Sequence, residues 1–211
     1  CLLFPKDKII QLKKLNLTPS FHVNHLFYYG DALKQQLIGR KRADNMLPIG
    51  FVKNSGIKYS LHSDQPMFES DPFRLIQTSV ERKTLSGDTL GDKQKLSVLE
   101  AIKSLTRNAA WQINMENKIG SLEKGKYADF IIIDKNPLKI QTHKLSTIKC
   151  LQTFVNGNLI YNQGKFNETA ILQVLETSRN ENIMEDYSLD MIYSRCDDMY
   201  DRALRFQVLR F

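Results

Sequence analysis

The chain has 211 residues, of which 42% are hydrophobic and 25% charged, a balance that is typical of folded globular proteins and argues against a disordered chain. It contains no apolar run of roughly 18 residues and no export signal at its start, so a membrane partner is not expected. The net charge of +7 comes from scattered basic residues without interleaved aromatic residues or zinc-finger spacing, which argues against a nucleic-acid partner. Three widely separated cysteines match no disulfide framework and predict a reducing compartment, the cytoplasm.

Predicted helices and strands alternate through residues 1–118. Capping residues mark several helix starts: Asp31 is expected at an N-cap, Asp71 precedes Pro72, and Ser97 stands three residues before Glu100 in a capping box. Such alternation predicts an α/β fold with a parallel sheet. The expected order is a helix (5–15), a strand (18–23), two helices (30–38 and 48–55), a strand (57–61) and two helical segments (71–82 and 97–113).

Residues 119–165 are expected to form a β-rich region. Gly120 and Gly125 flank a turn, and an apolar run predicts a strand at 128–134. Asn156-Gly157 predicts a hairpin, because Asn-Gly accepts the positive φ angles of a type I′ turn.

Residues 166–211 differ again in composition. They hold nine acidic residues, five arginines and no lysine, and they predict an acidic, helical tail. The sequence leaves open whether this tail packs on the domain, binds a partner or is out of frame.

The side chains best suited to catalysis follow the two predicted strands. His62 and Asp64 follow the strand at 57–61, and His22 and His25 end the strand at 18–23. Because functional groups gather at the carboxyl ends of parallel strands, we expect these groups to face one mouth of the sheet, with one further strand between the two. An aspartate there can bind a metal ion and accept a proton from water, and a neutral imidazole can supply a further ligand.

A structural interpretation of these residues stays open. Asp64 can simply cap the loop before Pro66, and the two histidines can be one packed and one exposed side chain. One histidine and one aspartate also fall short of the three protein ligands that catalytic zinc usually takes. Since the chain starts at Cys1 rather than at methionine, we expect a piece of a longer protein, with the missing ligands upstream.

Several ordered segments resemble amidohydrolase family 3, the branch of the amidohydrolase superfamily that includes N-substituted formamide deformylase. The Tyr-Gly-Asp and His-Ser-Asp-x-Pro segments point to this branch, and the last segment is typical of amidohydrolases as a group. The segments are residues 15–21, 24–25 with 29–31, 62–66, 71–72, 80–82, 106–110 and 119–130.

The resemblance implies the C-terminal part of a metal-dependent (β/α)8 barrel over residues 1–118, then part of a small β-sandwich over 119–165. It implies that Asp64 ends the eighth strand, binds a divalent metal, expected to be zinc, and serves as general base. By the same resemblance His25 is a metal ligand ending the sixth strand, with His22 as second choice. His62 and Arg82 match positions near the substrate pocket.

The resemblance also implies what this chain lacks. The His-x-His pair of the first strand, the carboxylate or modified lysine and the fifth-strand histidine have no counterpart here. We therefore expect a hydrolase of small amide-type substrates that is inactive without the N-terminal part of its barrel. A noncatalytic remnant or interaction domain that kept the fold signature is the alternative, and a basic binding module is a third.

Overall fold

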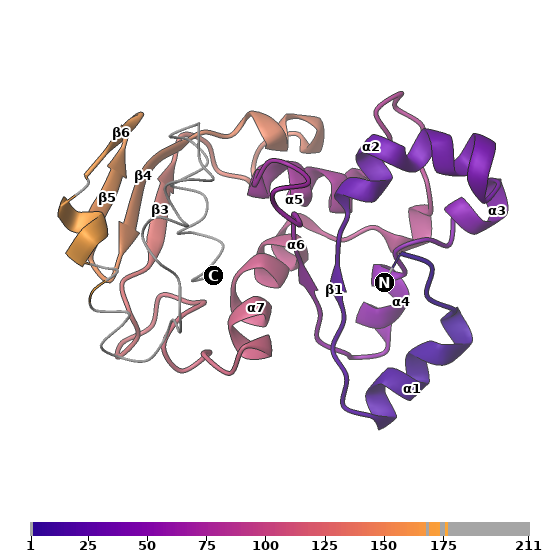
Figure 1. Cartoon of the computed structure of the whole chain (residues 1–211), viewed down its shortest axis with the longest axis horizontal. Coiled ribbons are helices and arrows are strands. Elements are labelled where there is room, and N and C mark those ends of the chain that lie inside the picture. The colour runs from indigo at the N-terminus through magenta and orange to yellow at the C-terminus, as the bar shows by residue number, and fades with distance from the viewer. Residues whose placement is uncertain (1, 168, 174–175, 177–211) are drawn as a thin grey trace.

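The computed structural model describes residues 2–167, 169–173 and 176 (Figure 1). Most of the tail predicted over 166–211 therefore lies outside the described residues, and residues 169–173 within it are helical as predicted. The strands are β1 (Ser20–Phe21), β2 (Ser60–Leu61), β3 (Phe130–Ile133), β4 (Cys150–Val155), β5 (Asn158–Asn162) and β6 (Lys165–Phe166). The helical segments are η1 (Lys6–Lys8), α1 (Ile9–Lys14), α2 (Asn24–Ala32), η2 (Leu33–Leu37), α3 (Arg40–Ala43), α4 (Ile49–Asn54), α5 (Pro72–Glu81), η3 (Asp92–Gln94), α6 (Val98–Leu105), α7 (Arg107–Gln112) and η4 (Thr142–Thr147).

Strands β1 and β2 form the parallel pair expected of an α/β fold, and that class is confirmed. Ser20 pairs with Ser60 and Phe21 with Leu61. The two strands are hydrogen-bonded neighbours, so the prediction that another strand lies between them is wrong. The chain between them crosses over through α2, η2, α3 and α4, as a parallel connection requires.

A second sheet holds β3, β4, β5 and β6 in antiparallel order. The predicted Asn156-Gly157 turn joins β4 to β5, with φ angles of 49° and 76° at the two residues. The Asp129 carboxylate accepts a hydrogen bond from the Asn156 backbone N–H at 2.7 Å, which fixes the turn against the residues that lead into β3. The sheet lies at the opposite end of the molecule from α1–α4 (Figure 1).

Two helix starts follow the capping chemistry of the sequence. The Asp71 carboxylate accepts from the backbone N–H groups of Phe73 and Arg74 at the start of α5. At α6, the Ser97 hydroxyl accepts from the Glu100 N–H while the Glu100 carboxylate accepts from the Ser97 N–H, a complete capping box.

The helix predicted at 30–38 begins earlier, at Asn24, so Asp31 is not its N-cap. The Asp31 carboxylate instead accepts from the hydroxyls of Thr84 and Ser86 and from the Ser86 backbone N–H. These bonds join α2 to the loop after α5. Gly30 lies against the same loop, since a Cβ built there would be 2.6 Å from the Thr84 methyl carbon.

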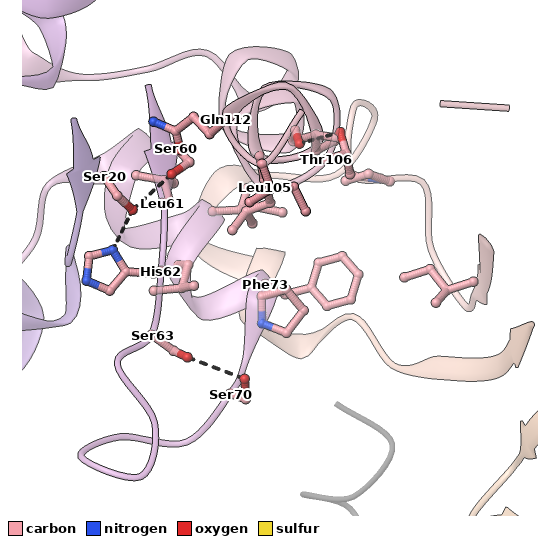
Figure 2. Close-up of a pocket in the computed structure, with 18 of the residues that line it drawn as sticks. Ser20, Ser60, Leu61, His62, Ser63, Ser70, Phe73, Leu105, Thr106 and Gln112 are labelled. Atoms are coloured by element: carbon pink, nitrogen blue, oxygen red, sulfur yellow. Dashed lines mark hydrogen bonds between the residues drawn. The ribbon is translucent and has the colours of Figure 1, made fainter. Parts of the chain in front are cut away.

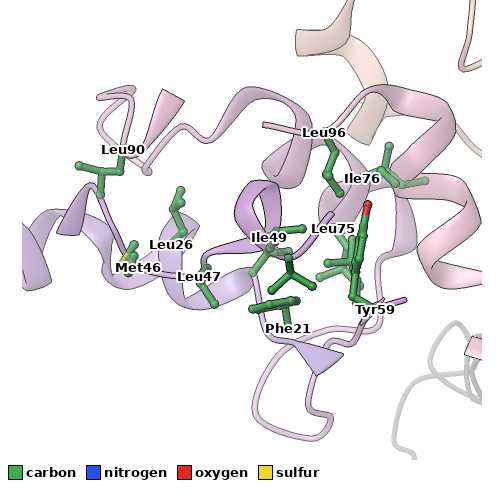
Figure 3. Close-up of a cluster of buried hydrophobic side chains, with 14 of the residues drawn as sticks. Phe21, Leu26, Met46, Leu47, Ile49, Tyr59, Leu75, Ile76, Leu90 and Leu96 are labelled. Atoms are coloured by element: carbon green, nitrogen blue, oxygen red, sulfur yellow. The ribbon is translucent and has the colours of Figure 1, made fainter. Parts of the chain in front are cut away.

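The main hydrophobic core is built around β1, β2 and the helices that flank them, with buried residues such as Phe21, Ile49 and Ile76 (Figure 3). Leu145 and Ile148, from the region after residue 118, belong to the same cluster. Helix α5 and η4 are also joined by hydrogen bonds from the Ser146 N–H to Gln77 and from the Thr142 hydroxyl to Glu81. The boundary between residues 118 and 119 stays a prediction, and side chains from both sides of it share one core.

Within the part of the chain that the structure describes, no helix combines the length and the apolar character that crossing a membrane requires.

Candidate functional site

Three histidines and an aspartate come together where β1 and β2 end. His22 and His62 follow the paired residues of the two strands, and their rings stack with centroids 5.3 Å apart. The ring of His25, in the first turn of α2, meets the His22 ring edge-on at 4.2 Å. Oδ2 of Asp64 lies 3.7 Å from Nδ1 of His22. We call His22, His25, His62 and Asp64 the histidine cluster, with His22 at its centre.

His62 is oriented by serines from both strands. The Ser60 hydroxyl donates to Oγ of Ser20 at 2.9 Å, and Oγ of Ser20 lies 2.7 Å from Nδ1 of His62 (Figure 2). With its oxygen accepting from Ser60, Ser20 has its own hydroxyl hydrogen to donate to Nδ1 of a neutral imidazole. The parallel register that pairs Ser20 with Ser60 thus fixes the ring of His62.

The environment of His22 favours its neutral form. Burial, reinforced by the neighbouring His25 and His62, lowers the pKa of His22 to about 4, while Asp64 acts in the opposite direction. Burial also lowers the pKa of His62. Both ring nitrogens of His22 and Nδ1 of His25 are buried without a hydrogen-bond partner. A buried polar atom without a partner is costly, so these nitrogens favour a bound group that would satisfy them.

Asp64 is the exposed member of the histidine cluster, with 59% of its side chain accessible to solvent. Its φ of 59° is in the left-handed region, which Asp adopts more readily than most residues. The loop that follows is closed at its base by a hydrogen bond between the buried hydroxyls of Ser63 and Ser70, 3.3 Å apart. The carboxylate is thus open to solvent at the carboxyl end of β2, with His22 as its neighbour.

A cavity of about 480 Å³ lies beside His62. Its walls are mainly apolar and come from β2, α5, α6, α7 and β3, with Leu61, Phe73, Leu105 and Ile131 among them (Figure 2). Its polar lining includes Ser20, Ser60 and His62, together with Ser63, Ser70, Thr106 and Gln112. This cavity brings the predicted barrel segment and the β-rich segment to one surface.

Comparison with known proteins identifies the family. The sequence model of the amidohydrolase family, amidohydrolase family 3, matches residues 1–161. The chain belongs to the amidohydrolase family. It is 30% identical over 116 residues to N-substituted formamide deformylase from Arthrobacter pascens, and 29% identical over 150 residues to the putative amidohydrolase YtcJ from Bacillus subtilis. These matches cover 55% and 70% of this chain but only 21% and 27% of the two relatives, so this amidohydrolase-family chain spans about a quarter of their length.

Solved structures agree with the family at the level of the fold. An uncharacterized metal-dependent hydrolase from Pyrococcus furiosus is 25% identical, with a TM-score of 0.55 over 65% of this chain and 28% of that one. An adenosine deaminase from Xanthomonas campestris, solved with bound zinc, reaches a TM-score of 0.55 over 86% of this chain and 40% of that one. At 13% identity the deaminase supports the fold alone.

The pairing of β1 with β2 changes the strand assignment within the amidohydrolase resemblance. If Asp64 ends the eighth strand, its hydrogen-bonded neighbour along the chain is the seventh, not the sixth. The argument that made His25 the sixth-strand ligand, with His22 as second choice, therefore fails. That either histidine binds a metal stays a prediction: His22 lies 3.7 Å from Asp64, and His25 lies against the ring of His22.

The donor chemistry of the histidine cluster suits a divalent metal, but its geometry is incomplete. An exposed carboxylate and imidazoles whose ring nitrogens have no hydrogen-bond partner are ligand types that zinc prefers. Among the residues that the structure describes, however, no group of three or more His, Cys, Asp or Glu side chains converges closely enough to hold an ion. The described residues of this amidohydrolase-family chain therefore do not form a complete metal site by themselves.

Arg82 does not join the histidine cluster. It is 1% exposed, and its guanidinium donates to the backbone carbonyls of Leu90, Leu47 and Met46 at 2.7, 3.2 and 2.8 Å. Burial lowers the pKa of Arg82 to about 9, which leaves it charged at neutral pH. The geometry corrects the prediction that Arg82 lies near the substrate pocket. Its donors instead hold the end of α5 to the adjacent carbonyls of Met46 and Leu47 and to the carbonyl of Leu90.

Sequence reasoning missed the serines and the aromatic side chains of this region. The positions of Ser20 and Ser60 beside His62 depend on the strand register, which the sequence does not reveal. Phe68, in the loop after Asp64, contacts both His22 and His25, with ring centroids 5.1 and 6.4 Å away. Its place two residues after Pro66, the last residue of the His-Ser-Asp-x-Pro segment, is a weak signal.

Proposed function

We propose that this chain is the C-terminal portion of a metal-dependent amidohydrolase that hydrolyses the C–N bond of a small amide-type substrate. In this proposal β1 and β2 are the last two strands of a (β/α)8 barrel, and β3–β6 are part of a small β-sandwich. The observation that carries the proposal is the exposed Asp64 carboxylate at the end of β2, beside the buried His22 imidazole. Family membership supports the reaction class.

Asp64 is the proposed general base. Its Oδ2 atom accepts a proton from the attacking water, and the same atom returns that proton to the leaving nitrogen as the C–N bond breaks. The products are a carboxylic acid and an amine, so atoms and protons balance. A neutral His22 at 3.7 Å leaves Asp64 able to accept this proton, whereas a protonated His22 would form an ion pair with the carboxylate and make it a weaker base.

Asp64 is also the proposed protein ligand to a divalent metal, zinc being the expected ion. His25 and His22 are the candidate imidazole ligands, by their position and by their unpartnered ring nitrogens. Such an ion acidifies a water molecule that would otherwise not ionise near neutral pH. Because the described residues alone offer fewer than three converging ligands, we propose that the isolated chain turns over no substrate.

Amide hydrolysis by a longer polypeptide tests this function. The DNA 5′ of the Cys1 codon would be read in frame, and the product that includes the preceding barrel strands would be assayed with zinc on a panel of N-substituted formamides. We expect turnover, and at least a thousandfold loss in Asp64→Asn with zinc content measured alongside. The matched control is Asp92→Asn, an exposed carboxylate of η3 that pairs with Lys95, which should keep full activity. Equal activity of Asp64→Asn and Asp92→Asn would refute the role of Asp64.

One observation favours a second candidate, a noncatalytic remnant. The described residues do not converge as a three-ligand metal site. A stop codon directly upstream of Cys1, or turnover that zinc does not affect in the longer polypeptide, would favour the remnant over the hydrolase. Turnover by the isolated 211-residue chain with zinc would instead contradict the proposed need for the rest of the barrel.

A further inference from the structure

A group of aromatic side chains adjoins the histidine cluster. Phe68 stacks on Tyr28 with ring centroids 4.8 Å apart and an interplanar angle of 14°. The ring of Tyr29 lies 5.6 Å from Phe68 and 5.9 Å from His25. We call Phe68, Tyr28 and Tyr29 the aromatic platform. It joins the loop after β2 to the helix after β1, the same two elements that present Asp64 and His25.

The aromatic platform is fixed by contacts with the histidine cluster and with its own loop and helix. Phe68 meets the rings of His22 and His25 at angles of 63° and 72°, so the histidines support it edge-on. The loop that carries Phe68 is closed at its base by the Ser63–Ser70 hydrogen bond. Tyr28 in turn meets Phe27 edge to face at 4.9 Å. These contacts fix the three rings before any ligand arrives, which lowers the entropic cost of binding.

The aromatic platform stays accessible despite these contacts. Tyr28 is 40% exposed and Tyr29 is 43% exposed, while Phe68 is partly buried. Neither tyrosine is needed to seal the core, because the buried residues of α2 are Asn24, Leu26 and Gly30. The aromatic platform reaches Asp64 through His22, whose ring contacts Phe68 and whose Nδ1 lies 3.7 Å from the Asp64 carboxylate. Exposed aromatic side chains form a surface whose chemistry suits a planar apolar group, since aromatic rings gain from stacked and edge-to-face contacts.

We propose that the aromatic platform is the substrate subsite for a planar aromatic substituent, and that it holds the adjoining amide C–N bond at Asp64. This inference rests on the proposed amidohydrolase function and deepens it by naming the substrate class. The position of Phe68 between the histidines and the tyrosines makes it the specificity-determining residue. A saturated ring of equal size fills the same volume but offers no flat face, so the aromatic platform discriminates between the two.

Binding of two matched amides to the purified 211-residue chain tests the proposal without requiring turnover. The probes are acetanilide, which carries a phenyl ring on the amide nitrogen, and N-cyclohexylacetamide, which carries a saturated ring. Saturation-transfer NMR detects binding, and titration of ligand line widths gives each Kd. We expect acetanilide to bind about fivefold more tightly, because an aromatic pair contributes about 1 kcal/mol beyond its buried area.

Variants assign the preference to the aromatic platform. Phe68→Leu keeps an apolar side chain but loses the flat ring, so the fivefold preference should disappear, while Phe68→Tyr should retain it. The matched control is Phe154→Leu, which removes one ring of the stacked Phe130–Phe154 pair in the second sheet, where the centroids are 4.5 Å apart. Circular dichroism confirms that each variant is folded. If Phe68→Leu does not fold, Tyr29→Leu at the exposed rim replaces it.

Each outcome decides the proposal. Loss of preference in Phe68→Leu with retention in Phe154→Leu supports it. Equal binding of the two probes to the native chain, no binding of either, or the same preference in Phe68→Leu as in the native chain overturns it. None of these results bears on whether Asp64 supports hydrolysis in the longer polypeptide, so failure here is distinguishable from failure of the proposed function.

Discussion

Replacing Arg82 with methionine should destabilise the protein strongly, because the guanidinium is a buried tie between three chain segments. The change leaves the carbonyl oxygens of Leu90 and Met46 without their donor, whereas the carbonyl of Leu47 still accepts from the Ile49 backbone N–H at 2.7 Å. Each orphaned buried acceptor costs about 1–3 kcal/mol. Methionine recovers part of this, since a buried charge no longer needs to be desolvated. Two orphaned acceptors with this partial recovery give an expected net loss of about 2–4 kcal/mol, a large share of the total stability of a domain.

Urea unfolding followed by far-ultraviolet circular dichroism measures this loss. With a slope of about 2 kcal/mol per molar urea, the midpoint of Arg82→Met should fall by about 1–2 M. Arg82→Lys keeps the charge but cannot span three carbonyls, so an intermediate loss is expected. Arg107→Met, at an exposed position of α7, is the matched control and should shift the midpoint little. If Arg82→Met were as stable as Arg107→Met, the structural role would be wrong and a pocket role for Arg82 would return.

Three further predictions concern His22, Gly50 and Ser97. The pKa of His22 is lowered from 6.5 to about 4 in the folded chain, so His22 contributes about 3 kcal/mol to the free energy of unfolding above pH 6.5, and this contribution is lost as the pH falls towards 4. His22→Leu should therefore flatten the fall in urea midpoint between pH 7 and pH 4. An unchanged fall would contradict this reasoning. Gly50→Ala places a Cβ against the Lys93 carbonyl oxygen and should lower the free energy of unfolding, measured in urea, by about 1–3 kcal/mol. Asn54→Ala, on the exposed side of α4, is the control and should leave it unchanged. Equal midpoints for the two variants would argue against close packing at Gly50. Ser97→Ala should lower the melting temperature through a loss of about 1 kcal/mol, while Ser97→Thr, which keeps the capping hydroxyl, should not.

Local chemistry in the sequence predicted the helix starts and the hairpin, while long-range contacts decided the rest. The caps at Asp71 and Ser97 and the Asn156-Gly157 turn each depend on neighbours within a few residues, and all are present. The start of α2 was misplaced because the carboxylate of Asp31 finds its partners at Thr84 and Ser86. No local pattern reveals a bond across more than fifty residues.

The histidine cluster shows the same division. The rule that functional groups end parallel strands placed His22, His62 and Asp64 at one end of a sheet, and the structure has them in contact. The order of the strands depends on pairing, so their direct adjacency was not foreseen. Arg82 was misjudged because an arginine held by backbone carbonyls and an arginine that binds a ligand are identical in sequence.

The contacts between α5 and η4 bear on how this polypeptide can be dissected. Gln77 and Glu81 hold η4 by hydrogen bonds, and Leu145 buries its side chain in the core that surrounds β1. A fragment that stops after Lys118 would therefore leave one wall of that core in contact with water. Limited digestion in the segment between α7 and β3 should yield two pieces that remain associated, and calorimetry of the nicked material should show a single melting transition.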